Sequence, residues 1–353
     1  MALLLAAGGV GLDGAPYLPR DGGVDGHPVL WYAREGGVDV AGEAFRTPLV
    51  EFSPEALVEI IEWLTPQRLA SLIDVTDLKA DTQEPKIHKM VAWATRYGCA
   101  SICVNPVEVD LLPGLLQGTS VKECYVIDFP LGKSTIEMKA HQAGQVVAQS
   151  RVMRGEGAGW VELDMVINVG RLKRDPDYTR REIAAVVEAA DGEHVKTIIR
   201  SSELLDEEIV TACRVAKEAG AHFVKNSTGM DAFGATPDHI RLMREAVGPE
   251  TGVKAAGGIR DAMGVARLIY AGALDPKLRT PDRFRIGTSG PINIISTLGW
   301  LRQVPRAWAE AGVVPCTVCP SNHTEKQRRE VREVYMQRCR HCPHFEYRKD
   351  KDF

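Results

Sequence analysis

The feature that most constrains this chain is a regular alternation of short β-branched runs with amphipathic helical stretches. Residues 85–97, 182–190 and 207–219 each carry apolar residues at helical spacing. Strands that alternate with helices predict a parallel sheet covered by helices. The eight runs that we expect to be strands are Leu72–Val75, Ala100–Asn105, Tyr125–Phe129, Val161–Asn168, Val195–Ile199, Phe223–Ser227, Val253–Gly257 and Arg285–Thr288.

Eight such units are typical of a (β/α)₈ TIM barrel. The alternative is a doubly wound open sheet, which usually has a glycine-rich phosphate turn after its first strand. Here the first run is followed by Thr76-Asp77-Leu78-Lys79, which lacks that turn. We therefore expect the α/β barrel, preceded by an additional helix from Pro54 to about Ala70.

Composition divides the 353 residues into three zones. Residues 1–50 are rich in glycine and proline, so we expect an irregular N-terminal extension with short strands around Val29–Tyr32. Residues 51–304 carry the barrel, and residues 305–353 form a small polar C-terminal tail.

The net charge and the cysteine content limit which binding partners and which cellular compartment we expect. A net charge of −4 gives no electrostatic reason to expect nucleic acid or an anionic membrane. No apolar run reaches the roughly 18 residues that span a bilayer, and the apolar start lacks the basic region of a secretory signal. We expect a cytoplasmic homo-oligomer, a dimer or higher, that acts on a small molecule. Four cysteines fit a reduced, buried state: Cys99, Cys103, Cys124 and Cys213.

Three lysines lie inside expected strands at intervals of 29 residues: Lys196, Lys225 and Lys254. Since a barrel has no edge, we expect all three in its mouth at similar heights. Burial and like charge both lower the pKa of a lysine, and a neutral amine is the nucleophile that forms a Schiff base with a carbonyl. Lys196 is the candidate for that amine. A structural ion-pair network is the alternative.

A nucleophilic lysine needs a proton shuttle. Glu162 and Asp164 share one face of the fourth expected strand, so at least one carboxylate points inward. Asp164 lies nearer the C-terminal end, where barrel enzymes have their active sites, and is the preferred acid/base. Asp74 on the first strand is a further inward carboxylate, for binding or for anchoring a network.

Glycine-rich turns follow the last three expected strands, just before helices. Free backbone N–H groups and the helix dipole attract a phosphate at such turns. The predicted substrate and phosphate contacts in this region are Ser227, Gly229, Lys254, Gly257, Gly258, Gly287 and Ser289.

These motifs resemble the deoxyribose-phosphate aldolase family in order and spacing over roughly residues 70–298. The matching segments are Ile73–Lys79, Val104–Pro106, Phe129–Gly132, Glu162–Gly170, Val195–Ile199, Phe223–Gly229, Lys254–Arg260 and Arg285–Ser289.

The resemblance implies a lyase that reversibly cleaves 2-deoxy-D-ribose 5-phosphate to acetaldehyde and D-glyceraldehyde 3-phosphate without a catalytic cofactor. By this resemblance Lys196 matches the Schiff-base lysine, Lys225 the second lysine that lowers the pKa of the first, and Asp164 the acid/base.

One departure concerns the substrate. The family usually has Glu-Thr-Gly after the fifth strand, where this chain has Arg200-Ser201-Ser202. By alternation Arg200 shares the inward face with Lys196, so we hypothesise that it recruits extra negative charge. A related Schiff-base aldolase acting on another phosphorylated or acidic sugar is therefore an alternative, as is an inactive metal-bound scaffold.

The tail contains two cysteine pairs with the spacing C-x₂-C-x₁₉-C-x₂-C. This spacing predicts a tetrahedral structural zinc site. An iron–sulfur cluster or four unconnected thiols are the alternatives. The four predicted ligands are Cys316, Cys319, Cys339 and Cys342.

Overall fold

The computed structural model describes residues 50–155 and 159–301. Within these residues eight parallel strands close into a barrel in chain order, which confirms the predicted (β/α)₈ architecture and rules out the open sheet. Each predicted run overlaps an observed strand. The strands are β1 (Ile73–Thr76), β2 (Ser101–Val104), β3 (Lys122–Ile127), β4 (Val161–Val166), β5 (His194–Ile198), β6 (Phe223–Lys225), β7 (Gly252–Ala256) and β8 (Phe284–Thr288).

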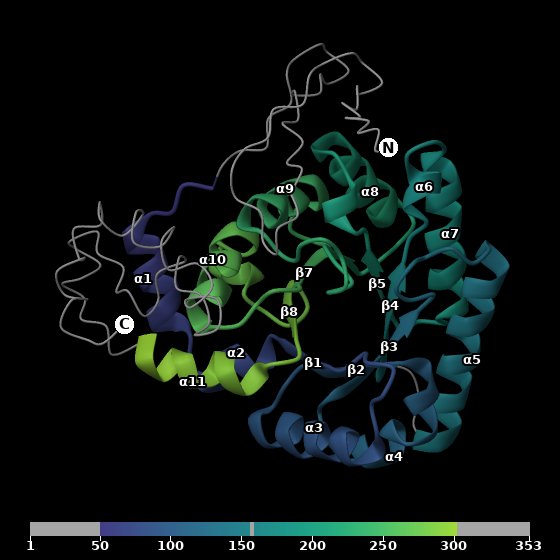
Figure 1. The fold of residues 1–353 in the computed structure, drawn as a ribbon, viewed down its shortest axis with the longest axis horizontal. Coiled ribbons are helices and arrows are strands. Elements are labelled where there is room, and N and C mark those ends of the chain that lie inside the picture. The colour runs from purple at the N-terminus through teal and green to yellow at the C-terminus, as the bar shows by residue number, and fades with distance from the viewer. Residues whose placement is uncertain (1–49, 156–158, 302–353) are drawn as a thin grey trace, which may run out of the picture. The chain divides into compact units, whose positions relative to one another are not determined.

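The helices surround the strands as an outer ring (Figure 1). They are α1 (Pro54–Trp63), α2 (Pro66–Ser71), α3 (Glu84–Tyr97), α4 (Leu112–Leu116), α5 (Ile136–Arg154), α6 (Val169–Leu172), α7 (Pro176–Ala189), α8 (Asp206–Glu218), α9 (Pro237–Val247), α10 (Ala262–Gly272) and α11 (Pro291–Leu301). Three short 3₁₀ turns lie in the loops: η1 (Pro106–Asp110), η2 (Ser201–Glu203) and η3 (Pro276–Leu278).

Local sequence signals set several helix ends. The Thr236 hydroxyl accepts a hydrogen bond from the His239 N–H and so caps the N-terminus of α9, which begins at Pro237. The predicted single helix before the first strand is instead two helices. Leu64 has an extended backbone, and Thr65 caps a new helix at Pro66, because proline cannot supply the N–H that a continuous helix needs there.

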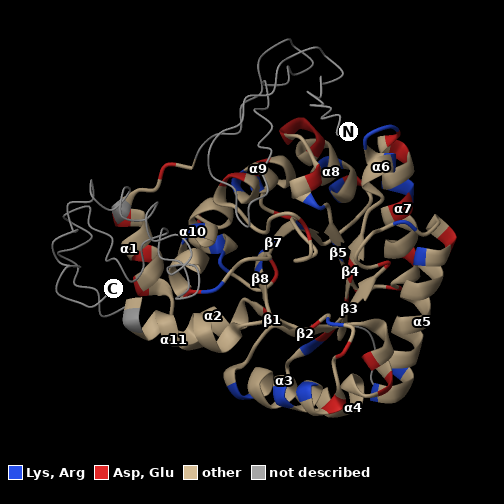
Figure 2. Cartoon of the chain, in the orientation of Figure 1, with Lys and Arg blue, Asp and Glu red and all other residues tan. Residues whose placement is uncertain are grey.

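Strand β4 shows how both faces of the barrel wall are buried. Leu163 and Met165 are fully buried and point outward to the helices, because side chains alternate along a strand. Glu162 and Asp164 point to the barrel axis, and both are also fully buried. Charged residues therefore mark the central strands as well as the outer helices (Figure 2).

Several predictions fall on other parts of the chain. The irregular extension up to residue 49, its short strands and the four-cysteine tail lie outside the described residues. Among the residues that are described, no helix combines the length and the apolar character needed to cross a bilayer.

Candidate active site

The side chains inside the barrel form layers of four, each drawn from alternate strands, as the strand register requires. All members except glycine point to the axis. Three of these layers carry the charged side chains. The upper one holds Cys103, Asp164, Lys225 and Gly287; the middle one holds Asp74, Cys124, Lys196 and Lys254; the lowest holds Ser101, Glu162, Phe223 and Arg285. A further layer of Thr76, Val126, Ile198 and Ala256 lies above them, toward the C-terminal mouth.

Lys196 and Lys225 are therefore not at the same height. Lys196 pairs in register with Phe223, whereas Lys225 pairs with Ile198. Lys225 stands one layer nearer the mouth than Lys196. This corrects the expectation of similar heights, which counted residues between strands without the stagger that closes a barrel.

The Asp164 carboxylate is the centre of the site. Its Oδ2 atom accepts from Lys225 Nζ at 2.8 Å and from Lys254 Nζ at 2.7 Å. Its Oδ1 atom accepts from Lys196 Nζ at 3.2 Å. The predicted acid/base carboxylate thus contacts all three predicted lysines.

Lys196 is the lysine most enclosed by carboxylates. Its Nζ atom lies 2.6 Å from Glu162 Oε2, 3.2 Å from Asp164 Oδ1 and 3.8 Å from Asp74 Oδ2. Its side chain is fully buried. The predicted inward orientation of Glu162, Asp164 and Asp74 is confirmed.

Arg285 joins the lower half of this network. Its guanidinium lies 2.6 Å from Asp74 Oδ1 and 2.9 Å from Glu162 Oε1. Lys254 Nζ lies 2.6 Å from the other Asp74 oxygen. The cluster holds four cationic side chains and three carboxylates, all buried.

The pKa shifts run opposite to the sequence expectation for Lys196. Burial lowers the pKa of the Lys196 amine, but the neighbouring anionic groups, Asp164 first, outweigh burial and raise that pKa overall. The pKa of Lys254 is raised well above its usual value in the same way. The expected lowering of the Lys196 pKa is therefore wrong, because attraction between its ammonium group and the surrounding anionic groups outweighs the effect of burial.

The same contacts act on the carboxylate. Burial alone raises the pKa of Asp164, but Lys196, Lys225 and Lys254 outweigh burial and hold that pKa well below its usual range. Asp164 is therefore ionised at neutral pH despite being fully buried.

A cavity of about 740 Å³ opens above the cluster at the C-terminal ends of β1, β6, β7 and β8. Gly287 lines it, and a Cβ atom added there would lie 3.2 Å from Lys254 Cε. The lack of a side chain at Gly287 thus leaves room beside Lys254. The predicted phosphate contacts Gly229, Gly257, Gly258 and Ser289 line the same cavity.

The glycine turns differ in what they offer an anion. The N–H groups of Gly257 and Gly258 donate to no other described residue, and both glycines have positive φ. In the turn after β6, by contrast, the Gly229 N–H donates to Ser227 Oγ and the Thr228 N–H donates to Asp231. The turn after β7 is therefore the better anion site in this conformation.

Arg200 is not on the inward face of β5. The strand ends at Ile198, and Arg200 follows in the left-handed region with φ 54°, so strand alternation does not apply. Its Nε atom donates to Asp231 Oδ1 at 2.7 Å. The other Asp231 oxygen accepts from Ser227 Oγ at 2.7 Å. Arg200 therefore braces the turn after β6 through Asp231.

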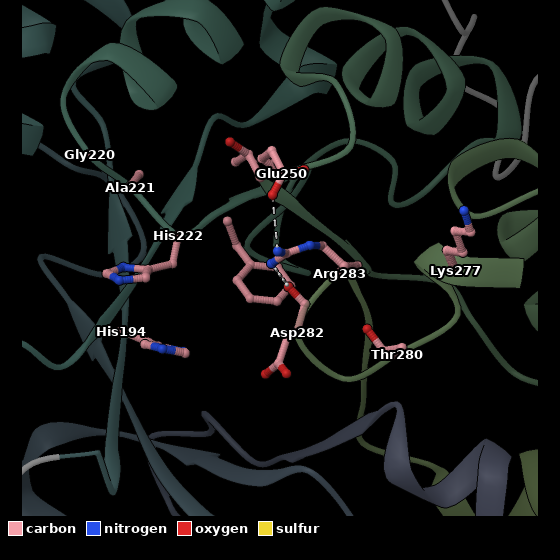
Figure 3. Close-up of a pocket in the computed structure, with 11 residues that line it drawn as sticks. His194, Gly220, Ala221, His222, Glu250, Lys277, Thr280, Asp282 and Arg283 are labelled. Carbon is pink, nitrogen blue, oxygen red and sulfur yellow. Dashed lines mark hydrogen bonds and ion pairs between the residues drawn. The ribbon is translucent and has the colours of Figure 1, made fainter. Parts of the chain in front are cut away.

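A second cavity, of about 720 Å³, lies at the opposite, N-terminal ends of the strands. Figure 3 shows the His194 and His222 rings side by side and Arg283 directed to Glu250. The two rings stack with centroids 4.4 Å apart, and burial lowers the pKa of His194 to about 4. None of the predicted site residues lines this cavity.

Sequence reasoning missed three lumen residues that contact the charged cluster. Arg285 was treated only as the start of a strand, and Cys103 and Cys124 only as small buried residues. Burial of the cysteines is confirmed, but their side chains contact Asp164. Strand alternation could have identified all three residues, because each is an even number of residues from an inward-facing position of its strand.

A barrel whose lumen holds buried lysines beside carboxylates defines an enzyme of the aldolase class. Residues 69–273 match the protein family described as DeoC/LacD family aldolase. Deoxyribose-phosphate aldolase from Clostridium perfringens is 46% identical over 230 residues, which cover 65% of this chain and 94% of that protein. Deoxyribose-phosphate aldolase 1 from Bacillus licheniformis is 46% identical over 234 residues, with 66% and 96% covered.

The solved structures agree. The deoxyribose phosphate aldolase from Aeropyrum pernix, described as a tetramer, superposes with a TM-score of 0.60 at 28% identity and covers 72% of this chain and all of its own. This chain belongs to the DeoC/LacD aldolase family.

The Asp164 network predicts a pH-dependent stability. Below about pH 4 the unfolded chain takes up a proton on Asp164 that the folded state does not, so the free energy of unfolding falls as pH falls. Asp164→Asn should lower that free energy by about 3–5 kcal/mol near neutral pH and make it less sensitive to acid. Urea unfolding across the acidic range measures both, with the exposed Asp110 changed to Asn as control. Equal acid sensitivity in Asp164→Asn and wild type would contradict the prediction.

Proposed function

We propose that this protein reversibly cleaves 2-deoxy-D-ribose 5-phosphate to acetaldehyde and D-glyceraldehyde 3-phosphate through a lysine Schiff base. The observation that carries the proposal is the buried lysine–carboxylate cluster beneath a cavity rimmed by glycine turns. The names of the relatives at 46% identity support the same substrate.

Which lysine forms the Schiff base stays a prediction, and we propose Lys225 in place of Lys196. Lys225 lies one layer nearer the mouth than Lys196, and its strand runs directly into the turn whose Thr228 and Gly229 line the cavity. Its amine contacts one carboxylate, that of Asp164. Lys196 lies deeper and is held by three.

The charge balance also favours Lys225. With four cations and three carboxylates, loss of one proton leaves the buried cluster neutral, and burial of uncompensated charge is costly. Lys196 and Lys254 each contact at least two carboxylates. Lys225 is therefore the amine whose deprotonation breaks the fewest ion pairs.

The proposed steps follow from that geometry. The neutral Lys225 amine attacks the aldehyde carbon C1, and loss of water gives the protonated Schiff base. The C3 hydroxyl gives up its proton, the C2–C3 bond breaks, and glyceraldehyde 3-phosphate leaves. The remaining enamine is protonated at C2, and hydrolysis releases acetaldehyde. Asp164, 2.8 Å from Lys225 and 2.7 Å from Lys254, holds the two amines together and moves protons with water.

Trapping tests the proposed nucleophile. Incubation with acetaldehyde and sodium borohydride should add one ethyl group to Lys225, because the reductant fixes the Schiff base as a secondary amine. Peptide mass spectrometry locates the adduct. Lys225→Met should lose the adduct and lower kcat by several orders of magnitude.

Lys196→Met is the matched control for this assignment. It should keep the ethyl adduct on Lys225 while weakening activity, since its amine braces Glu162 and Asp164. An adduct on Lys196 in the wild type would refute Lys225 and restore Lys196. No adduct with a broad panel of aldehydes would support the inactive scaffold instead.

A second candidate is an aldolase for another phosphorylated or acidic sugar, with Arg200 recruiting the extra charge. The Arg200 guanidinium is already paired with Asp231 at 2.7 Å and lies 3.6 Å from Glu203. Because the Asp231 carboxylate already neutralises this guanidinium, Arg200 attracts an additional anionic group on a ligand only weakly. This observation supports deoxyribose 5-phosphate as the substrate.

A double-mutant cycle separates these two roles of Arg200. If Arg200 acts through Asp231, then Arg200→Met and Asp231→Asn should each raise KM for deoxyribose 5-phosphate, and the double variant should be no worse than either alone. Kinetic constants for the four proteins measure the coupling. Additive effects, or a loss confined to acidic sugars in Arg200→Met, would point to direct substrate contact.

We further propose that the tail binds a structural zinc ion through Cys316, Cys319, Cys339 and Cys342, on the strength of their C-x₂-C-x₁₉-C-x₂-C spacing. We also propose a homo-oligomer in the cytoplasm. The tetrameric Aeropyrum pernix relative supports oligomerisation, and the four unpaired cysteines among the described residues fit a reducing compartment.

Native mass spectrometry of the full-length protein tests the metal and the assembly together. We expect an oligomeric mass with one zinc ion per chain, because thiolates at this spacing enclose a tetrahedral ion. Changing Cys316 and Cys319 to Ser should remove the zinc. Iron with inorganic sulfide would favour the cluster, and a metal-free monomer would refute both proposals.

A further inference from the structure

Two cysteine side chains meet inside the barrel beside Asp164. Cys103 on β2 and Cys124 on β3 are register partners on adjacent parallel strands, and both point to the lumen. Both are fully buried. Their sulfur atoms and an Asp164 oxygen all lie within 4.8 Å of one another.

This geometry fits a disulfide. Neighbouring strands lie roughly 4.8 Å apart, and disulfides join residues whose Cα atoms are about 4.4–6.8 Å apart. Small side-chain rotations would bring the two sulfurs to bonding distance.

A metal ion fits the same group of residues less well. The Asp164 carboxylate already accepts from three lysine amines. A divalent cation at the sulfurs would face these ammonium groups at close range and displace them at a large electrostatic cost. A disulfide adds no charge to the cluster.

We propose that Cys103 and Cys124 form a reversible disulfide, made by hydrogen peroxide and undone by cellular thiols, that switches off the lysine cluster. The Cys103 sulfur attacks one peroxide oxygen, the O–O bond breaks, and water and a sulfenic acid form. The Cys124 sulfur then attacks the sulfenic sulfur, the S–O bond breaks, and a second water leaves. The two sulfurs are oxidised and the two peroxide oxygens are reduced.

The two thiols are not equivalent, which supports this order of attack. The neighbouring Cys124 side chain is the main cause that lowers the pKa of Cys103. Burial is the main cause that raises the pKa of Cys124 well above its usual value. Cys103 also lies one layer nearer the mouth than Cys124, in the layer of Gly287, which lines the cavity.

The disulfide would act through Asp164, and this consequence rests on the proposed function. Cys124 donates to Asp164 Oδ1 at 3.2 Å, and Cys103 lies 3.8 Å from Oδ2. Lys196 Nζ lies 3.4 Å from Cys124 Sγ. Oxidation removes both S–H donors and moves the sulfurs toward each other, so the carboxylate that holds Lys225 loses two of its partners.

The test treats the full-length protein with hydrogen peroxide, alkylates it, and maps its peptides without reduction. We expect a peptide pair linked through Cys103 and Cys124. We also expect aldolase activity to fall to about one tenth of its untreated value or below. Dithiothreitol should restore the activity and remove the linked pair. Because the link is measured by mass, it does not depend on the identity of the substrate.

Two variants make the test specific. Cys124→Ala should give no linked pair and no loss of activity that dithiothreitol reverses. Cys213→Ala, a buried cysteine of α8 outside the lumen, should keep both, and the tail cysteines remain in each protein. Absence of the linked pair overturns the disulfide, and a linked pair with undiminished activity overturns the switch. Absence of cleavage in untreated protein refutes the proposed function while the mass data still judge the disulfide.

Discussion

The structure of this site depends on one buried carboxylate. Asp164 is fully buried and accepts hydrogen bonds from three lysines on three neighbouring strands. Without it, like charges would face each other in a medium of low dielectric constant. The lysines in turn keep Asp164 ionised. The charged groups in the lumen therefore stabilise one another's ionised forms.

The charged groups in the lower layers and those in the upper layer have different roles. The lower layers pair Arg285 with Asp74 and Glu162, and Lys196 with Glu162, and these contacts fix the floor of the site. The upper charged layer carries one lysine, one carboxylate, one thiol and a glycine, and the glycine lines the cavity. The groups proposed to react thus stand nearer the cavity than the groups that brace them.

The rim shows how a departure in sequence can be absorbed locally. Arg200 replaces a residue that is acidic in most of the family it resembles, yet its charge is met by Asp231. Asp231 also accepts from the Ser227 hydroxyl and the Thr228 N–H. The Arg200 charge therefore supports a turn, and its ion pairs among the described residues are with Asp231 and Glu203 rather than with the lysine cluster.

The sequence by itself determined the barrel and the membership of the site. Alternating β-branched and amphipathic segments identify all eight strands, and strand parity identifies Asp74, Asp164 and the lysines as inward residues. Only the tertiary structure decided their heights, partners and charges. The stagger that closes a barrel puts Lys225 above Lys196, and the contacts of each amine with carboxylates on other strands reverse the expected pKa shift of Lys196. Such contacts join residues far apart in the chain, so no local pattern records them.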